Sequence, residues 1–176
     1  MILIVVAPIV PQTFNGVQPA DTRAREYEQD LREVLPEADT FESVDGPYMH
    51  FRAYRGGPET ERRTLVGYAF FTNELGARSR GYAGVMEIMV GLNRSGVITG
   101  IKAVNHFEPY GYRSIDTEAY RAQFKNKTVL DPFKVGQDVD AISGATITVR
   151  GATGAIKVSA RRMAREFVAK RSNDQE

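Results

Sequence analysis

Residues 140–148 read Asp-Ala-Ile-Ser-Gly-Ala-Thr-Ile-Thr and place small residues and hydroxyl groups directly before a predicted helix. The first backbone N–H groups of a helix have no partner within it, and the helix dipole adds partial positive charge there. Both effects favour an anion, so the segment predicts a phosphate site. In the alternative interpretation, the hydroxyl of Ser143, Thr146 or Thr148 simply caps the helix.

The string Asp-x-x-Ser-Gly-Ala-Thr-x-Thr closely resembles the flavinylation motif of the FMN-binding domain family. That family includes the G subunit of the Rnf electron-transport complex, the C subunit of the sodium-translocating NADH:quinone reductase and the NosR-type maturation flavoprotein of nitrous oxide reductase. In it, a flavin transferase outside the cytoplasm joins FMN through its phosphate to the motif's Thr. The resemblance implies covalent FMN on Thr146, which must be exposed. It also implies that the surrounding motif residues are Asp140, Ser143, Gly144, Ala145 and Thr148.

Three upstream stretches also resemble the family. They are Gly81-Tyr82-Ala83-Gly84, Gly96-Val97-Ile98-Thr99-Gly100 and the loop His106-Phe107-Glu108-Pro109-Tyr110-Gly111. The loop, followed by a further Tyr, resembles the NosR type more than the Rnf type. The resemblance implies additional cofactor contacts from His106, Glu108, Pro109, Tyr110, Gly111 and Tyr112.

Some of these contacts have competing interpretations. Tyr110 and Tyr112 are candidates for a flat wall beside the isoalloxazine ring, but a loop Tyr is more often a half-buried packing residue. Glu108 either orders its loop by accepting backbone hydrogen bonds, which we favour, or contacts the flavin edge. His106 and His50 are expected to be ordinary core or surface histidines.

The chain departs from its relatives in two respects. Val149-Arg150 follows the motif where a Ser-Arg pair is common, a change beyond the attachment string. The chain also lacks the membrane helices and Cys-rich part of NosR-type proteins, which indicates an excised domain or a stand-alone relative.

Composition restricts the class of protein. The 176 residues are 42% hydrophobic and 26% charged, which suits one globular domain, and a net charge of +1 argues against nucleic acid as a partner. The absence of Cys excludes disulfides, thiolate metal sites, iron–sulfur clusters and a Cys nucleophile. Two histidines leave little for a histidine metal centre.

Hydrophobic periodicity predicts an α+β fold with a central antiparallel sheet and flanking helices. A helix should begin at Asp21 or Thr22 and end before Pro36. The predicted strands cover residues 49–54, 65–72, 85–92 and 97–104, the last two forming a hairpin through Gly96. Further helices are expected over 117–125 and 151–170.

The chain ends have separate interpretations. Residues 1–20 should be an extended or partly disordered arm, either the remnant of a signal or anchor or a buried strand; residues 21–172 should form the FMN-binding domain and 173–176 a tail. Residues 150–171 are strongly basic, which usually marks a solvated helix face and alternatively a peripheral contact with membrane headgroups.

The resemblance therefore implies an extracytoplasmic, membrane-associated electron-transfer module, a redox carrier without a catalytic residue of its own. Its partners would be a flavin transferase and either membrane electron-transfer subunits or a periplasmic reductase, as in a NosR-type protein supporting nitrous oxide reduction. The alternative is a non-redox sensor or maturation module with loosely bound FMN or none. A substrate-transforming flavin reductase is a weaker third hypothesis, because no acid/base constellation accompanies the motif.

Overall fold

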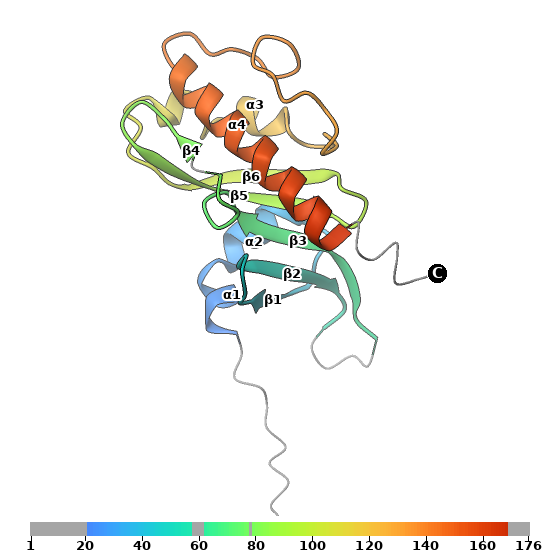
Figure 1. Cartoon of the computed structure of the whole chain (residues 1–176). Coiled ribbons are helices and arrows are strands. Elements are labelled where there is room, and N and C mark those ends of the chain that lie inside the picture. Colours follow the sequence, from blue (N-terminus) through green and yellow to red (C-terminus); the bar gives the residue numbers. More distant parts are fainter. Residues whose placement is uncertain (1–20, 58–61, 78, 169–176) are drawn as a thin grey trace, which may run out of the picture.

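An antiparallel sheet forms the centre of the computed structural model, which describes residues 21–57, 62–77 and 79–168 (Figure 1). The strands of this described part run in the spatial order β1-β2-β3-β5, and both β4 and β6 pair with β5. Their bounds are β1 Thr40–Val44, β2 His50–Arg55, β3 Thr64–Phe71, β4 Ser79–Arg80, β5 Val85–Asn93 and β6 Ile98–Asn105.

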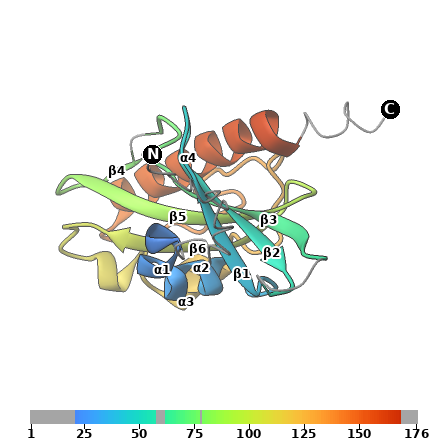
Figure 2. The same cartoon turned by 90° about the horizontal axis from the view of Figure 1, so that it is seen from below.

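Helices cover both faces of the sheet, which confirms the predicted α+β architecture. α1 (Thr22–Glu26) and α2 (Glu28–Val34) lie on one face, and α4 (Thr146–Met163) crosses the other (Figure 2). The Tyr120 hydroxyl of α3 (Glu118–Ala122) lies 3.1 Å from Thr153 Oγ1, which fixes α3 against α4. A short π-helical turn, η2 (Ala164–Val168), continues α4.

The central strands explain why both faces need a helical layer. Phe70 of β3 and Val90 of β5 are buried in the core beneath α4, whereas Phe71 and Met89 are buried in the core beneath α1 and α2. Successive side chains of a strand point to opposite faces. A strand that is apolar throughout must therefore be covered on both sides.

The predicted strands and the hairpin are confirmed, and the turn residue Gly96 has a φ of 77°. Two strands were not predicted. β1 lies at the edge of the sheet and is half-buried along its whole length, so its sequence does not alternate clearly. β4 has only two residues, which is too short for any periodicity.

Two helix predictions were wrong in detail. The single helix expected before Pro36 is broken at Tyr27, whose ring packs edge-on against Phe71 at a centroid distance of 5.0 Å; Asp21 caps its first part, as expected. The last helix begins at Thr146, five residues before the predicted start at Gly151. Gly151 lies inside α4, where its missing side chain lets the helix approach the backbone carbonyl of Arg80.

The basic C-terminal segment is only partly a solvated face. Arg161 donates hydrogen bonds to the carbonyl oxygens of Val129 and Asp131, at 2.8 and 2.9 Å, and Arg162 donates to that of Leu75 at 2.6 Å. These two arginines therefore fasten loops to α4.

Predictions for the chain ends lie outside the described residues, namely the arm over 1–20, the last residues of the 21–172 domain and the tail over 173–176. Among the helices that the structure describes, none combines the length and apolar character that crossing a membrane requires.

Candidate functional site

The start of α4 is not capped by a side chain. Thr146 is its first residue and Ala145 occupies the N-cap position, where a methyl group cannot accept a hydrogen bond. Gly144, with a φ of 78°, turns the chain into the helix. The capping interpretation of Ser143, Thr146 and Thr148 is therefore wrong. The N–H groups of the first turn are left for an external acceptor.

The hydroxyl groups of the motif differ in environment. Thr146 is exposed, as attachment would require, and so is Ser143. Thr148 is buried and donates a hydrogen bond of 2.5 Å to Glu108 Oε2. Asp140 is exposed, and its backbone N–H donates to the side chain of Gln123 at 2.6 Å.

The carboxylate of Glu108 joins three separate segments. It is 7% exposed and accepts hydrogen bonds from the backbone N–H groups of Tyr82 and Ala83, at 3.0 and 2.8 Å, and from the Thr148 hydroxyl of α4. Burial raises the pKa of Glu108, but these hydrogen bonds outweigh burial and hold the pKa below its ordinary value. Glu108 thus accepts backbone hydrogen bonds, as the favoured loop-ordering role requires, and its contact with the flavin edge stays a prediction.

Gly81 and Gly111 allow two close contacts in this region. A side chain at Gly81 would collide with the Glu108 carboxylate, and one at Gly111 would collide with the His106 ring. His106 Nε2 lies 3.0 Å from Asp116 Oδ2, and the Glu108 N–H donates to His106 Nδ1 at 3.2 Å. This arrangement assigns the proton to Nε2 and makes His106 a brace for the loop.

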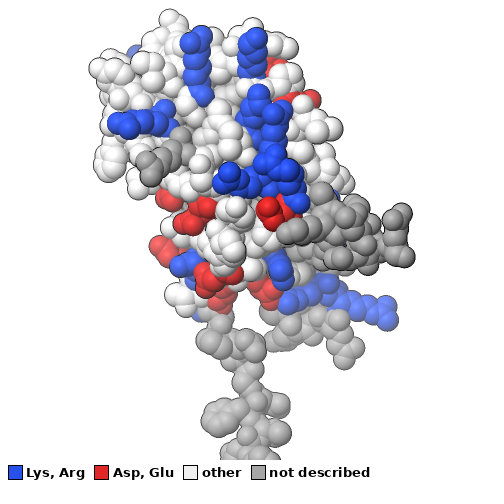
Figure 3. All heavy atoms as spheres, viewed as in Figure 1, with Lys and Arg blue, Asp and Glu red and all other residues white. Residues whose placement is uncertain are grey.

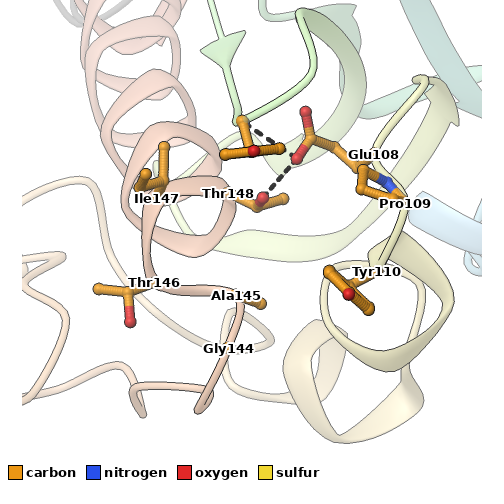
Figure 4. Close-up of a pocket in the computed structure, with 9 residues that line it drawn as sticks. Glu108, Pro109, Tyr110, Gly144, Ala145, Thr146, Ile147 and Thr148 are labelled. Atoms are coloured by element: carbon orange, nitrogen blue, oxygen red, sulfur yellow. Dashed lines mark hydrogen bonds between the residues drawn. The ribbon is translucent and has the colours of Figure 1, made fainter.

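A pocket of about 290 Å³ opens between this loop and the start of α4 (Figure 4). Thr146 and Ala145 lie on one side of it and Tyr110 on the other, with Glu108 and Thr148 above them in the view. Its lining residues are Tyr82, Glu108, Pro109, Tyr110, Gly144, Ala145, Thr146, Ile147 and Thr148.

The structure brings together seven of the twelve residues named from the sequence: Glu108, Pro109, Tyr110, Gly144, Ala145, Thr146 and Thr148. The other five, His106, Gly111, Tyr112, Asp140 and Ser143, lie outside the lining. Tyr82 and Ile147 were missed as lining residues. Both stood in segments singled out from the sequence. Tertiary contacts place the Tyr82 loop beside α4, namely the hydrogen bonds to Glu108 and the close approach of Gly151 to Arg80.

The histidines provide no metal site. The described residues contain no group of three or more His, Asp or Glu side chains that could hold a metal ion. His50 is buried, and its ring packs 4.3 Å from that of Phe167 between centroids. Burial lowers its pKa, and its Nε2 has no hydrogen-bond partner among the described residues. His50 is thus a core residue, although not a fully satisfied one.

The pocket suits a phosphorylated, flat ligand. The uncapped end of an 18-residue helix offers N–H donors to an anion, and the exposed Thr146 hydroxyl lies beside them. Tyr82, Tyr110 and Ile147 supply apolar and aromatic walls. The residues present therefore fit an FMN whose phosphate lies at the start of α4.

Comparisons with known proteins agree with this geometry. Residues 81–160 match the family model described as FMN-binding domain. The chain is 30% identical over 143 residues to the G subunit of an ion-translocating oxidoreductase complex from Methanosarcina acetivorans, covering 76% of this chain and 73% of that protein. It is 28% identical to the G subunit of the Na(+)-translocating ferredoxin:NAD(+) oxidoreductase complex from Acetobacterium woodii, covering 73% and 69%.

A third relative, the G subunit of the proton-translocating ferredoxin:NAD(+) oxidoreductase complex from Clostridium ljungdahlii, is 27% identical and is matched over 72% of this chain and 66% of its own length. The matched family region contains both the Glu108 loop and the Thr146 start of α4, the two sides of the pocket. The match to the family model and the 30% identity to the Methanosarcina acetivorans protein over most of both chains together show that the chain belongs to the FMN-binding domain family.

Proposed function

We propose that this chain is an extracytoplasmic electron-transfer module, one domain over residues 21–172, that carries FMN esterified through its phosphate to Thr146. One observation carries the covalent part: Thr146 is an exposed hydroxyl on the first residue of an uncapped helix, at the edge of the pocket. In this position the side chain and the N–H groups of the first turn can reach the same phosphate.

Attachment requires an activated flavin, and FAD, the phosphoanhydride of FMN and AMP, provides one. The Thr146 oxygen would attack the FMN phosphorus, the phosphoanhydride bond would break with AMP leaving, and the hydroxyl proton would pass to solvent. A flavin transferase would hold the donor. Gly144 leaves room for the transferase, because no atom lies within 4 Å of where a side chain on Gly144 would begin. Ala145, the other small residue of the motif, is buried.

The other lining residues hold this arrangement. Glu108, through Thr148, fixes the first turn of α4 against the Tyr82–Ala83 loop. Tyr110 and Tyr82 would flank the ring, and the proposed cofactor contacts also include the outlying motif residues His106, Gly111, Tyr112, Asp140 and Ser143. Bound FMN would supply the redox chemistry, and the protein its orientation and electrostatic surroundings.

The names of the relatives support a place in a multi-subunit complex, since each is the G subunit of an oxidoreductase complex that translocates ions or protons. We propose membrane electron-transfer subunits or a periplasmic reductase as partners. The His106–Tyr112 wording favours a NosR-type protein supporting nitrous oxide reduction. A non-redox sensor or maturation module is the second candidate.

The deciding experiment is intact mass and in-gel flavin fluorescence of denatured protein after export and co-expression with a flavin transferase. We expect a gain of one FMN less one water in wild type and in Thr146→Ser, and none in Thr146→Val. A flavin that survives denaturation in Thr146→Val would place the attachment elsewhere. Retained activity of Thr146→Val in the host pathway would favour the non-redox module.

A further inference from the structure

Exposed large apolar side chains line the pocket and also occur in the loop that forms one side of it. Tyr82, Tyr110 and Ile147 line it and are 73%, 55% and 59% exposed. Phe107 and Tyr112, from the same loop as Tyr110, are 80% and 62% exposed. We name these five residues the aromatic rim. Soluble proteins seldom expose grouped large apolar side chains unless the surface binds something.

Three exposed arginines lie close in sequence to residues of the aromatic rim, and one of them contacts it. Arg80 directly precedes the Gly81–Gly84 loop, Arg150 follows Thr146 by one helical turn, and the Arg113 guanidinium lies 5.3 Å from the centre of the Tyr112 ring. None of them forms an ion pair with a described residue. Basic side chains also gather along α4 (Figure 3).

Negative charge near the aromatic rim is largely compensated. The Glu108 carboxylate is buried and accepts three hydrogen bonds, and Asp116 is bonded to His106. Asp140 is the exposed carboxylate of the neighbouring motif. A partner approaching this side of the molecule therefore meets an apolar centre with an excess of arginine around it.

We propose that the aromatic rim and its three arginines are the docking surface for an acidic redox protein that exchanges electrons with the flavin. The inference rests on the proposed function, because the rim surrounds the place where the flavin would lie. Tyr, Phe and Arg are enriched at the centres of protein interfaces, whereas Lys is depleted. Arg80, Arg113 and Arg150 suit carboxylates, which guanidinium groups bind in bidentate fashion.

A protein fits this surface better than a bilayer does. A redox group can come close to the flavin only if the partner sits on the mouth of the pocket, and a bilayer covering the mouth would exclude that partner. Electrostatic attraction between an arginine border and an acidic partner would also accelerate their encounter.

The test uses flavinylated protein, reduced anaerobically and mixed in stopped flow with oxidised plastocyanin, an acidic acceptor, or with cytochrome c, a basic one. Each reduced flavin gives two electrons, one to each of two acceptor molecules. We expect the rate constant for the acidic acceptor to fall at least fivefold between about 10 and 200 mM salt, as screening weakens the attraction. The rate constant for the basic acceptor should not fall.

Two variants outside the pocket lining test the surface itself. Phe107→Ser and Arg113→Gln should each lower the rate constant for the acidic acceptor at least threefold, with flavin content and midpoint potential unchanged. Leu130 is 86% exposed and Lys134 is exposed, and both lie on a different loop, so Leu130→Ser and Lys134→Gln are matched controls that should have no effect.

The possible outcomes separate the two proposals. Unflavinylated protein despite an active transferase contradicts the proposed function, and the docking inference falls with it. Flavinylated protein whose rates respond neither to salt nor to these variants overturns the docking inference alone. Sedimentation with phosphatidylglycerol vesicles that Phe107→Ser abolishes overturns it as well and assigns the surface to lipid.

Discussion

Glu108 shows at the residue scale how one side chain holds a site together. Its carboxylate accepts hydrogen bonds from two backbone N–H groups and one hydroxyl group, whose residues lie 25 to 40 positions away in the sequence. In Glu108→Gln, the amide NH₂ group would face donors without being able to accept from them. Because hydrogen bonds to charged groups contribute about 1.5–3 kcal/mol each, we expect the free energy of unfolding to fall by about 2 kcal/mol or more. Urea denaturation measures it, with exposed Glu118→Gln as the control.

The same residue predicts a pH dependence. The folded-state pKa of Glu108 lies below its ordinary value of 4.5, so its stabilising contribution is present above that value. The contribution is lost as pH falls through the folded-state pKa. The difference in unfolding free energy between wild type and Glu108→Gln should therefore be constant near pH 7 and shrink below about pH 4.5. A difference that does not change down to about pH 3 would contradict an ionised Glu108.

Two glycines of α4 make a matched pair at the element scale. Ala is the better helix former by about 1 kcal/mol, and no atom lies within 4 Å of where a side chain on Gly154 would begin. Gly154→Ala should thus stabilise the protein by about 0.5–1 kcal/mol. Gly151→Ala would drive a methyl group into the Arg80 carbonyl and should destabilise by more than about 1 kcal/mol. Thermal unfolding of both variants checks the prediction, and equal stabilisation would show that α4 does not pack on β4.

The elements also show where prediction from sequence succeeds. Strands β2, β3, β5 and β6 follow from apolar runs and turn residues, because these patterns are local. The start of α4 does not, because Ala145 at the N-cap position is no cap signal and Gly151 looks like a break in the helix. Gly151 is explained only by its contact with β4, which is distant in sequence. The motif pointed to Thr146 from sequence alone. The place of Tyr82 in the pocket lining could not be predicted, because it depends on a hydrogen bond to Glu108, 26 residues away.

At the scale of the whole molecule, the sheet separates two hydrophobic cores, and only one of them lies beneath the site. The core beneath α4 supports the site, whereas the core beneath α1 and α2 lies on the opposite face. Leu31 is fully buried in the latter, so Leu31→Ala should cost about 2–5 kcal/mol in unfolding free energy. Flavin stoichiometry of the folded protein should nevertheless stay at the wild-type value. Denaturant titration measures the unfolding free energy, and intact mass measures the flavin stoichiometry. A Leu31→Ala protein that folds but carries less flavin than wild type would show that the two cores are not independent.

If FMN is esterified to Thr146 as proposed, the missing cap on α4 would give the cofactor a second role. Without a bound phosphate, the backbone amides of residues 146–148 have no acceptor among the described residues, so the first turn should open often and exchange its hydrogens quickly. An esterified phosphate would supply the acceptor that Ala145 cannot, and attachment would slow that exchange. The flavin would then be a permanent part of the helix that bears it, and isotope labelling could distinguish mature from immature molecules without reference to their colour.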